Sequence, residues 1–237
     1  MAEWFEDWFG EDYLALYPHR DEADAERAVA LIERTIPWRS DLKVLDVASG
    51  PGRHAAALER RGVRPIGIDL SATLLRRART LTTSPLVRAD MRLLPVRPAS
   101  MDLTLNLFTS FGYFSSDEEH ADVLTGMIDT VCPGGWFVLD FLHADRVRST
   151  LVAEGEAMMD DTPVKIRRSL SPDKKYVIKE IDPGDGRLFR EQVRLFTPDE
   201  LQHMVSPSLD VNAVFGDYDG NPLTQESPRV FLVGQRR

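Results

Sequence analysis

Over the first 145 residues, apolar side chains follow a helical pattern in some segments and a strand-like pattern in the segments between them. Residues 21–36 place apolar side chains on one face of a helix, and Pro37 ends it. Short, nearly continuous apolar runs further along predict buried strands, with helical patterns between them. The predicted strands cover 43–48, 64–70, 85–90, 101–108 and 136–142, and the predicted helices cover 53–62, 72–81 and 115–132. This rhythm is typical of an α/β fold with a mostly parallel sheet and helices on both faces.

The pattern changes after about residue 150. Three strand-like runs, 163–170, 174–181 and 187–196, are separated by the turn sequences SPD and DPGDG, which predicts an inserted antiparallel meander. Thr197 and Glu200 then have the spacing of a capping box at a helix start.

Residues 209–220 and 228–235 predict a closing antiparallel hairpin. The predicted organisation is an N-terminal lid and helix (1–37), a core (38–145 and 197–237) and an antiparallel insertion (146–196).

Charge and cysteine content narrow the class of protein. The chain has 237 residues, a formal net charge of −9 and one cysteine. An acidic body repels phosphate backbones, so we expect neither nucleic-acid nor membrane partners. Cys132, at a predicted helix end, reads as a small apolar residue. We expect a cytoplasmic protein without a metal site; its oligomeric state stays open, with a homodimer as one alternative.

The stretch VLDVASGPGRHAA, residues 44–56, predicts a strand, a glycine-rich turn and the start of a helix. Glycines there let the backbone approach a ligand closely. Gly50 to Ala55 fits the dinucleotide pattern G-x-G-x-x-A, and Asp69 lies near the expected distance for a ribose-binding acid. No lysine follows the glycines as a phosphate-binding loop requires.

Acidic residues end the first three predicted strands. Asp46, Asp69 and Asp90 lie 23 and 21 residues apart, which places their carboxylates along one edge of the sheet. Such a row repels a pyrophosphate and suits a ligand with hydroxyls, an exocyclic amine and a positive centre. The charge pattern therefore favours a ligand other than a dinucleotide.

These residues resemble the class I S-adenosylmethionine-dependent methyltransferases over residues 40–142. LDVASGPGR is similar to the D-x-G-x-G-x-G turn of that family, with Ala48 in place of the first glycine, and CPGGWFVLDF resembles its turn into the fifth strand. The resemblance implies a Rossmann-like fold and S-adenosyl-L-methionine as the cofactor. It also implies that Asp46, Ala48 and Gly50 line the methionine part of the cofactor.

The same resemblance implies that the ends of the second, third and fourth predicted strands bind the adenosine and the sulfonium of the cofactor. It implies that Asp69 accepts hydrogen bonds from the ribose hydroxyls and that Leu70 lies beside the adenine. It further implies that Asp90 and Met91 bind the adenine. By the same resemblance, Asn106 and Leu107 pass under the sulfonium.

A looser resemblance extends to the small-molecule branch of these enzymes, which often carries an N-terminal lid and an antiparallel insertion above the acceptor pocket. The segment YLALYPHR, residues 13–20, is similar to such a lid. It implies that Tyr17 and Arg20 close over the cofactor, with Arg20 pairing with the cofactor carboxylate.

Two residues are candidate general bases for the acceptor. His143 follows the fifth predicted strand, and Tyr113 follows the fourth. Of the other histidines, His54 reads as a packing or capping residue, and His120 and His203 read as surface groups on helices.

The sequence therefore predicts an enzyme that methylates nitrogen or oxygen of a small molecule. A non-catalytic protein that binds S-adenosylmethionine and an NAD(P)-dependent oxidoreductase remain alternatives. A nucleic-acid methyltransferase is disfavoured, because NLFTS stands where that class has an Asn/Asp-Pro-Pro-aromatic sequence after the fourth strand.

Overall fold

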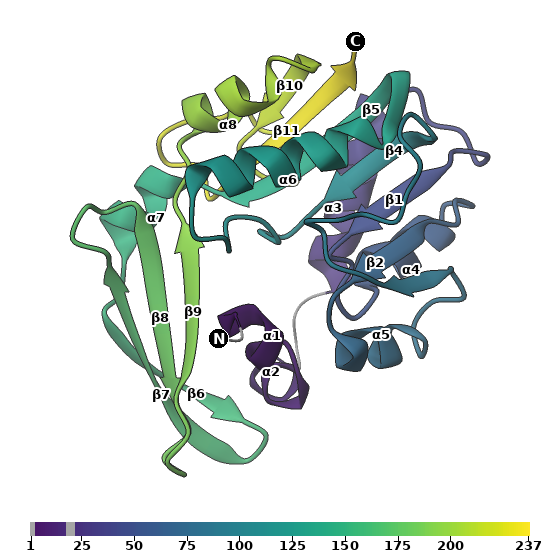
Figure 1. The fold of residues 1–237 in the computed structure, drawn as a ribbon. Helices are drawn as coiled ribbons and strands as arrows, with labels where there is room; N and C mark the ends of the chain where they lie inside the picture. The colour runs from purple at the N-terminus through teal and green to yellow at the C-terminus, as the bar shows by residue number, and fades with distance from the viewer. Residues whose placement is uncertain (1–2, 18–21) are drawn as a thin grey trace.

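The computed structural model describes residues 3–17 and 22–237, and its centre is a seven-stranded sheet (Figure 1). The strand order is β10-β11-β5-β4-β1-β2-β3. Strands β1 to β5 run parallel, whereas β11 lies antiparallel between β5 and β10. The predicted parallel core and closing hairpin are confirmed. The strands are β1 (Val44–Val47), β2 (Ile66–Asp69), β3 (Leu86–Arg88), β4 (Met101–Asn106), β5 (Val131–Leu142), β10 (Leu209–Phe215) and β11 (Arg229–Arg236).

Helices cover both faces of this sheet, as the alternating side chains of its strands require. Phe137 and Leu139 of β5 pack toward α6 and α8, while Val138 packs toward α3 and α4. Within the two described stretches of chain, no helix combines the length and apolar character needed to cross a bilayer. The core helices are α3 (Glu22–Thr35), α4 (Arg53–Glu59), α5 (Ala72–Ala78), α6 (Asp117–Asp129), α7 (Ala144–Thr150) and α8 (Pro198–Val205).

A separate four-stranded antiparallel sheet forms the insertion, with the order β6-β7-β8-β9. Three of its strands match the predicted meander, whereas β6 was not predicted, because GEAMM lacks a clear apolar alternation. The short helix α7, which links the two sheets, was missed as well. The strands are β6 (Glu154–Met159), β7 (Thr162–Leu170), β8 (Tyr176–Asp182) and β9 (Phe189–Arg194).

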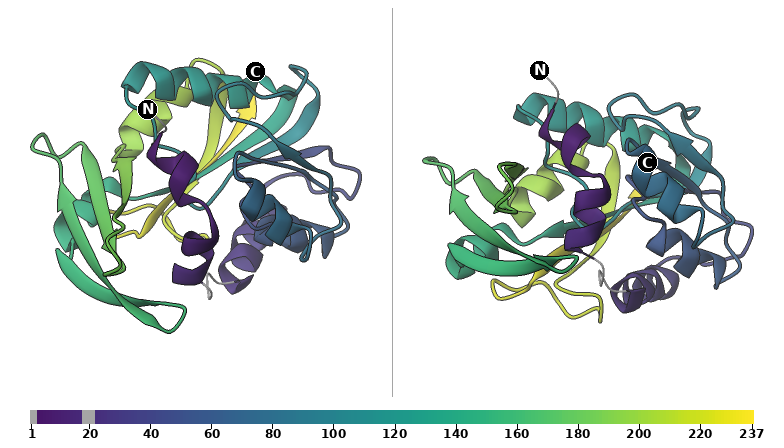
Figure 2. Two further views of the ribbon diagram at one scale, coloured as in Figure 1. Left: turned by 60° about the horizontal axis from the view of Figure 1, so that its bottom comes forward. Right: turned by 90° about the horizontal axis from the view of Figure 1, so that it is seen from below.

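Two short N-terminal helices, α1 (Trp4–Trp8) and α2 (Glu11–Leu16), lie between the inserted sheet and the core (Figures 1 and 2). Trp8 and Leu16 belong to a buried apolar cluster with Ile166 and Ile181 of the insertion. The N-terminal segment, residues 3–17, is called the lid below, and it is packed against the inserted sheet.

The fifth strand begins earlier than predicted. β5 starts at Val131, so Cys132 lies in a strand and not at a helix end. The strand can include the PGG sequence because its register with β4 shifts between Met101 and Leu103. A Cβ on Gly135 would lie 2.7 Å from a Val131 methyl group and 2.9 Å from the Asp102 carbonyl oxygen, so glycine is required there.

We expect Thr197→Ala to lower the free energy of unfolding by about 1 kcal/mol. Thr197 accepts a hydrogen bond from the Glu200 amide at 3.2 Å, and the Glu200 carboxylate accepts one from the Thr197 amide at 2.7 Å, which confirms the predicted capping box. Urea unfolding followed by circular dichroism measures the loss. Ser149→Ala, on the exposed side of α7, is the control and should change stability by less than about 0.5 kcal/mol. Equal stability of Thr197→Ala and the wild type would contradict the capping role.

Candidate functional site

The carboxyl ends of the parallel strands open into a cavity. The lid, the turn after β1, the ends of β2 and β3 and the segment after β4 form its walls. The predicted site residues that line it are Ala48, Gly50, Asp69, Leu70, Asp90, Met91, Leu107 and Tyr113.

The turn after β1 has a left-handed backbone at three positions. The φ angles are 57° at Ala48, 56° at Gly50 and 85° at Gly52. The Gly50 amide donates to one Asp69 carboxylate oxygen at 2.8 Å, and the Ser71 amide donates to the other at 2.8 Å. The turn and the end of β2 are thereby joined at the cavity.

Asp46 and Asn106 end neighbouring strands and are fully buried. Asp46 Oδ2 and Asn106 Oδ1 have no hydrogen-bond partner among the described residues. Burial, and then the charge of Asp69, raise the pKa of Asp46 to about 7. Burial also raises the pKa of Asp69, although its amide hydrogen bonds act in the opposite direction. Neither Asp46 nor Asn106 is part of the cavity lining.

Asp90 has a different environment from the other two acids. Burial acts to raise its pKa, but hydrogen bonds from the Arg92 side chain and amide outweigh burial, so the pKa is lowered. The Arg92 Nη2 atom lies 2.6 Å from Asp90 Oδ2. Asp90 is therefore an ionised acceptor on the cavity wall.

Asp140 fixes the turn after β4 in a strained conformation. Phe108 and Thr109 have φ angles of 60° and 61°, which side chains other than glycine rarely adopt. The fully buried Asp140 carboxylate accepts hydrogen bonds from the Phe108 amide at 2.8 Å, the Tyr218 hydroxyl at 2.7 Å and Arg229 Nε at 2.5 Å. Sequence reasoning missed this network, although an acid inside the apolar run WFVLDFL was a signal for it.

Aromatic rings form much of the remaining wall. Phe5 and Phe9 of the lid face Tyr113, with ring centroids 6.3 Å and 5.7 Å from it. Tyr13 lies 5.0 Å from Phe9, and Phe114 lies 6.1 Å from Phe5. All five rings line the same cavity as Asp69, so the lid and the core together close it.

The two candidate bases lie in different places. Tyr113 lines the cavity, and its hydroxyl donates to the Thr109 carbonyl at 2.7 Å. His143 does not line it. It is buried at the start of α7, where its Nδ1 accepts from the Arg146 amide at 3.4 Å.

Tyr17 lies on the side of the lid that meets the inserted sheet, away from the cavity lining. Its hydroxyl lies 3.4 Å from Glu191 Oε1 and contacts the Lys179 ammonium. Arg20, predicted to pair with the cofactor carboxylate, lies outside the described residues.

Two other histidines are buried. His54 lines the cavity, and burial, with the charges of Arg53 and Arg229, lowers its pKa to about 3, so the imidazole is neutral. The interpretation of His120 as a surface group was wrong. Its side chain is fully buried against Phe111 and Phe196, because the α6 face that carries it points into the core.

Residues 44–135 match the family described as a methyltransferase domain. The search of curated proteins gave no match. Among solved structures, the CcbJ methyltransferase from Streptomyces caelestis superposes with a TM-score of 0.80 at 20% identity, covering 98% of both chains. The sugar N-methyltransferase KedS8 from Streptoalloteichus gives 0.72 at 23% identity, covering 95% of this chain and 92% of its own. CalS10, an amino pentose methyltransferase from Micromonospora echinaspora, gives 0.67 at 22% identity, covering 95% and 96%.

The family match covers the glycine turn and all three acidic strand ends, so it decides between the two readings of that turn. A methyltransferase domain, and not a nicotinamide-dependent one, matches this turn, and the neighbour CalS10 was solved with S-adenosylmethionine bound. The order of the strands and the separate antiparallel sheet agree with the fold of the solved methyltransferases. Residues 44–135 thus match a methyltransferase domain, and the chain as a whole has the fold of solved S-adenosylmethionine-dependent methyltransferases.

Proposed function

We propose that this enzyme methylates the nitrogen of a neutral amine on a small-molecule acceptor. The carrying observation is that six phenylalanine and tyrosine rings and the buried acid Asp69 line one cavity, which the lid helps to close. KedS8 is a sugar N-methyltransferase and CalS10 an amino pentose methyltransferase, which agrees with an amine acceptor. A cytoplasmic location remains part of the proposal.

The buried acceptor atoms fit the cofactor. Asp46 Oδ2 and Asn106 Oδ1, which lack partners among the described residues, would accept hydrogen bonds from its ammonium group. Asp69 would accept from the ribose hydroxyls, and Asp90 from the adenine amine. Gly50 presents backbone without a side chain, and a Cβ there would meet no atom within 4 Å, so this part of the turn is open to a ligand.

When bound, S-adenosylmethionine supplies a methyl group on a positively charged sulfur. The aromatic wall of Phe5, Phe9 and Tyr113 would exclude water and orient the acceptor for in-line attack. Aromatic faces attract cations, so the same rings would stabilise the positive charge that a methylated nitrogen acquires.

The titratable groups of the described cavity wall favour nitrogen over oxygen. A neutral amine attacks without losing a proton first, whereas a hydroxyl benefits from a general base. His54 has a pKa of about 3 and is a weak base, and His143 does not line the cavity. Tyr113 is the residue that keeps oxygen as the second candidate, since its phenol lies in the cavity wall.

A panel of small amines and their matched alcohols and phenols, incubated with enzyme and methyl-labelled S-adenosylmethionine, tests the acceptor atom. We expect amines to be methylated at least about 10²-fold faster than the matched hydroxyl compounds, since a general base contributes about that much. Mass spectrometry of the products identifies the methylated atom. Faster methylation of the hydroxyl compounds would replace nitrogen by oxygen in the proposal.

We expect Asp69→Asn to weaken S-adenosylhomocysteine binding about 10- to 100-fold, because hydrogen bonds to a charged group contribute about 1.5–3 kcal/mol. Isothermal titration calorimetry measures the affinity. Asp102→Asn is the matched control. Asp102 lies at the start of β4, at the opposite end of the parallel strands from Asp69, and its carboxylate accepts a hydrogen bond from the Lys43 amide. Unchanged affinity in Asp69→Asn would contradict the ribose assignment.

We expect Asp46→Asn to stabilise the cofactor-free protein at neutral and alkaline pH. The folded-state pKa of Asp46 is about 7, well above its ordinary value of 3.8, so the folded state binds the proton more tightly than the unfolded state. Ionisation therefore destabilises the fold progressively as pH rises from about 4 to about 7. The gain from the variant should grow over that range and then level off at about 2–4 kcal/mol.

Urea unfolding from pH 5.5 to 8.5 without cofactor measures this gain. Asp210→Asn, at an exposed acid, is the control and should give a pH profile parallel to the wild type. A constant difference between Asp46→Asn and the wild type at every pH would contradict the raised pKa.

A further inference from the structure

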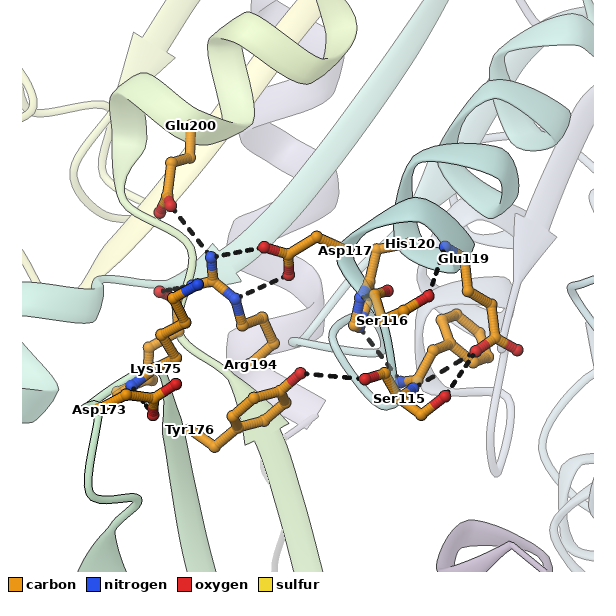
Figure 3. Close-up of polar contacts among 12 residues, drawn as sticks. Ser115, Ser116, Asp117, Glu119, His120, Asp173, Lys175, Tyr176, Arg194 and Glu200 are labelled. Atoms are coloured by element: carbon orange, nitrogen blue, oxygen red, sulfur yellow. Dashed lines mark hydrogen bonds and ion pairs between the residues drawn. The ribbon is translucent and has the colours of Figure 1, made fainter.

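The segment from Phe111 to Ser116, here called the wall segment, carries Tyr113 and Phe114 into the cavity lining. It lies after β4 and leads into α6. On its other side it meets the inserted sheet, where polar contacts cluster (Figure 3). The wall segment is thus placed between the methyltransferase core and the insertion.

Arg194, the last residue of β9, is the centre of this cluster (Figure 3). Its side chain is only 3% exposed. Nε and Nη2 bind the two Asp117 carboxylate oxygens at 2.9 and 3.1 Å, and Nη2 also binds Glu200 at 3.0 Å. The hydrogen bond with Arg194 is the main reason that the pKa of Asp117 is lowered. One buried cation therefore joins the insertion to the first turns of α6 and α8.

The backbone of Arg194 contacts the wall segment directly. Its amide donates to the Gly112 carbonyl oxygen at 2.8 Å. Gly112 has a φ angle of 91°, and a Cβ there would lie 3.1 Å from the Arg194 carbonyl oxygen. The Tyr176 hydroxyl of β8 adds a contact to the Ser115 carbonyl oxygen at 3.5 Å. The strand end and the wall segment are too close to move independently.

His120 fixes the wall segment from the core side. Its Nδ1 lies 2.6 Å from the Ser116 carbonyl oxygen, so it donates there, and its Nε2 accepts from the Phe114 amide at 3.2 Å. One nitrogen donates and the other accepts, so these contacts require a neutral imidazole. The wall segment is thereby tied to α6 next to the residue whose ring faces the cavity.

We infer that Arg194 is a positioning residue for the acceptor: it places Tyr113 and Phe114 at the cavity wall from behind, so that the inserted sheet sets the shape of the acceptor pocket. The ion pairs with Asp117 and Glu200 fix the end of β9, and the Gly112 contact passes this position to the wall segment. The inference rests on the proposed function in taking Tyr113 and Phe114 as contacts of the acceptor. The cofactor residues on β1 and β2 lie outside this set of contacts.

Hydrogen–deuterium exchange of wild type, Arg194→Gln and Arg194→Lys tests the positioning directly. We expect amides of residues 111–116 to exchange about tenfold faster in Arg194→Gln, with smaller acceleration in Arg194→Lys, and no change in β1 or β2. The dissociation constant of S-adenosylhomocysteine should stay within about threefold of wild type. Arg146→Gln, at an exposed ion pair with Glu226, is the matched control.

Kinetics with the panel compound that the wild type methylates fastest adds a second measurement. Arg194→Gln should raise KM for that compound about tenfold while kcat changes less. Unchanged exchange in residues 111–116, acceleration spread over the whole chain, or an unchanged KM would each overturn the inference. If the wild type methylates no compound of the panel, the proposed acceptor class fails, and the exchange experiment still decides whether Arg194 positions the wall segment.

Discussion

The hydrogen bond from the Gly50 amide to the Asp69 carboxylate joins the two strand ends on which the proposed cofactor site is built. It connects the turn after β1 to the end of β2 and requires the left-handed backbone at Ala48 and Gly50. For an alanine that conformation costs roughly 1–2 kcal/mol. The Ser49 amide partly offsets the cost by donating to the Ile68 carbonyl at 2.9 Å on the same neighbouring strand. The turn is thus held in place by two of its backbone amides, which donate to the Asp69 side chain and the Ile68 carbonyl of β2.

Buried acids serve two different purposes at the same sheet edge. Asp140 is compensated by Arg229, the Tyr218 hydroxyl and the Phe108 amide, so it can stabilise a strained turn. Asp46 has an acceptor oxygen without a partner among the described residues, and its charge is disfavoured by burial and by Asp69. A buried acceptor left without a donor lowers stability. A cationic ligand that donates to Asp46 would recover that energy.

Local signals gave the parts of the site that depend on neighbouring residues in the chain. Apolar periodicity and turn chemistry located the acidic strand ends and the capping residue Thr197, because caps and strand ends are set within a few residues. Long-range partners could not be read in this way: Arg194 meets Asp117 across 77 positions. His120 was misread because the acids around it in sequence suggested an exposed helix face, whereas its burial is decided by Phe111 and Phe196. Similarly, the sequence predicted that Tyr17 lies in the lid, but it did not reveal that Tyr17 is on the face of the lid that meets the insertion.

The lid has two faces, one toward the inserted sheet and one toward the cavity. Trp8 points to the insertion, where its indole N–H donates to Glu191 at 2.7 Å, while Phe5 and Phe9 line the cavity. Closing the cavity therefore needs the inserted sheet as a support for the lid. The β1 and β2 ends carry the residues proposed to bind the cofactor, so changes there would affect methylation of any acceptor. Changes in the lid, the insertion and the segment between Phe111 and Ser116 would alter the aromatic wall of the cavity and leave the Gly50–Asp69 contact intact.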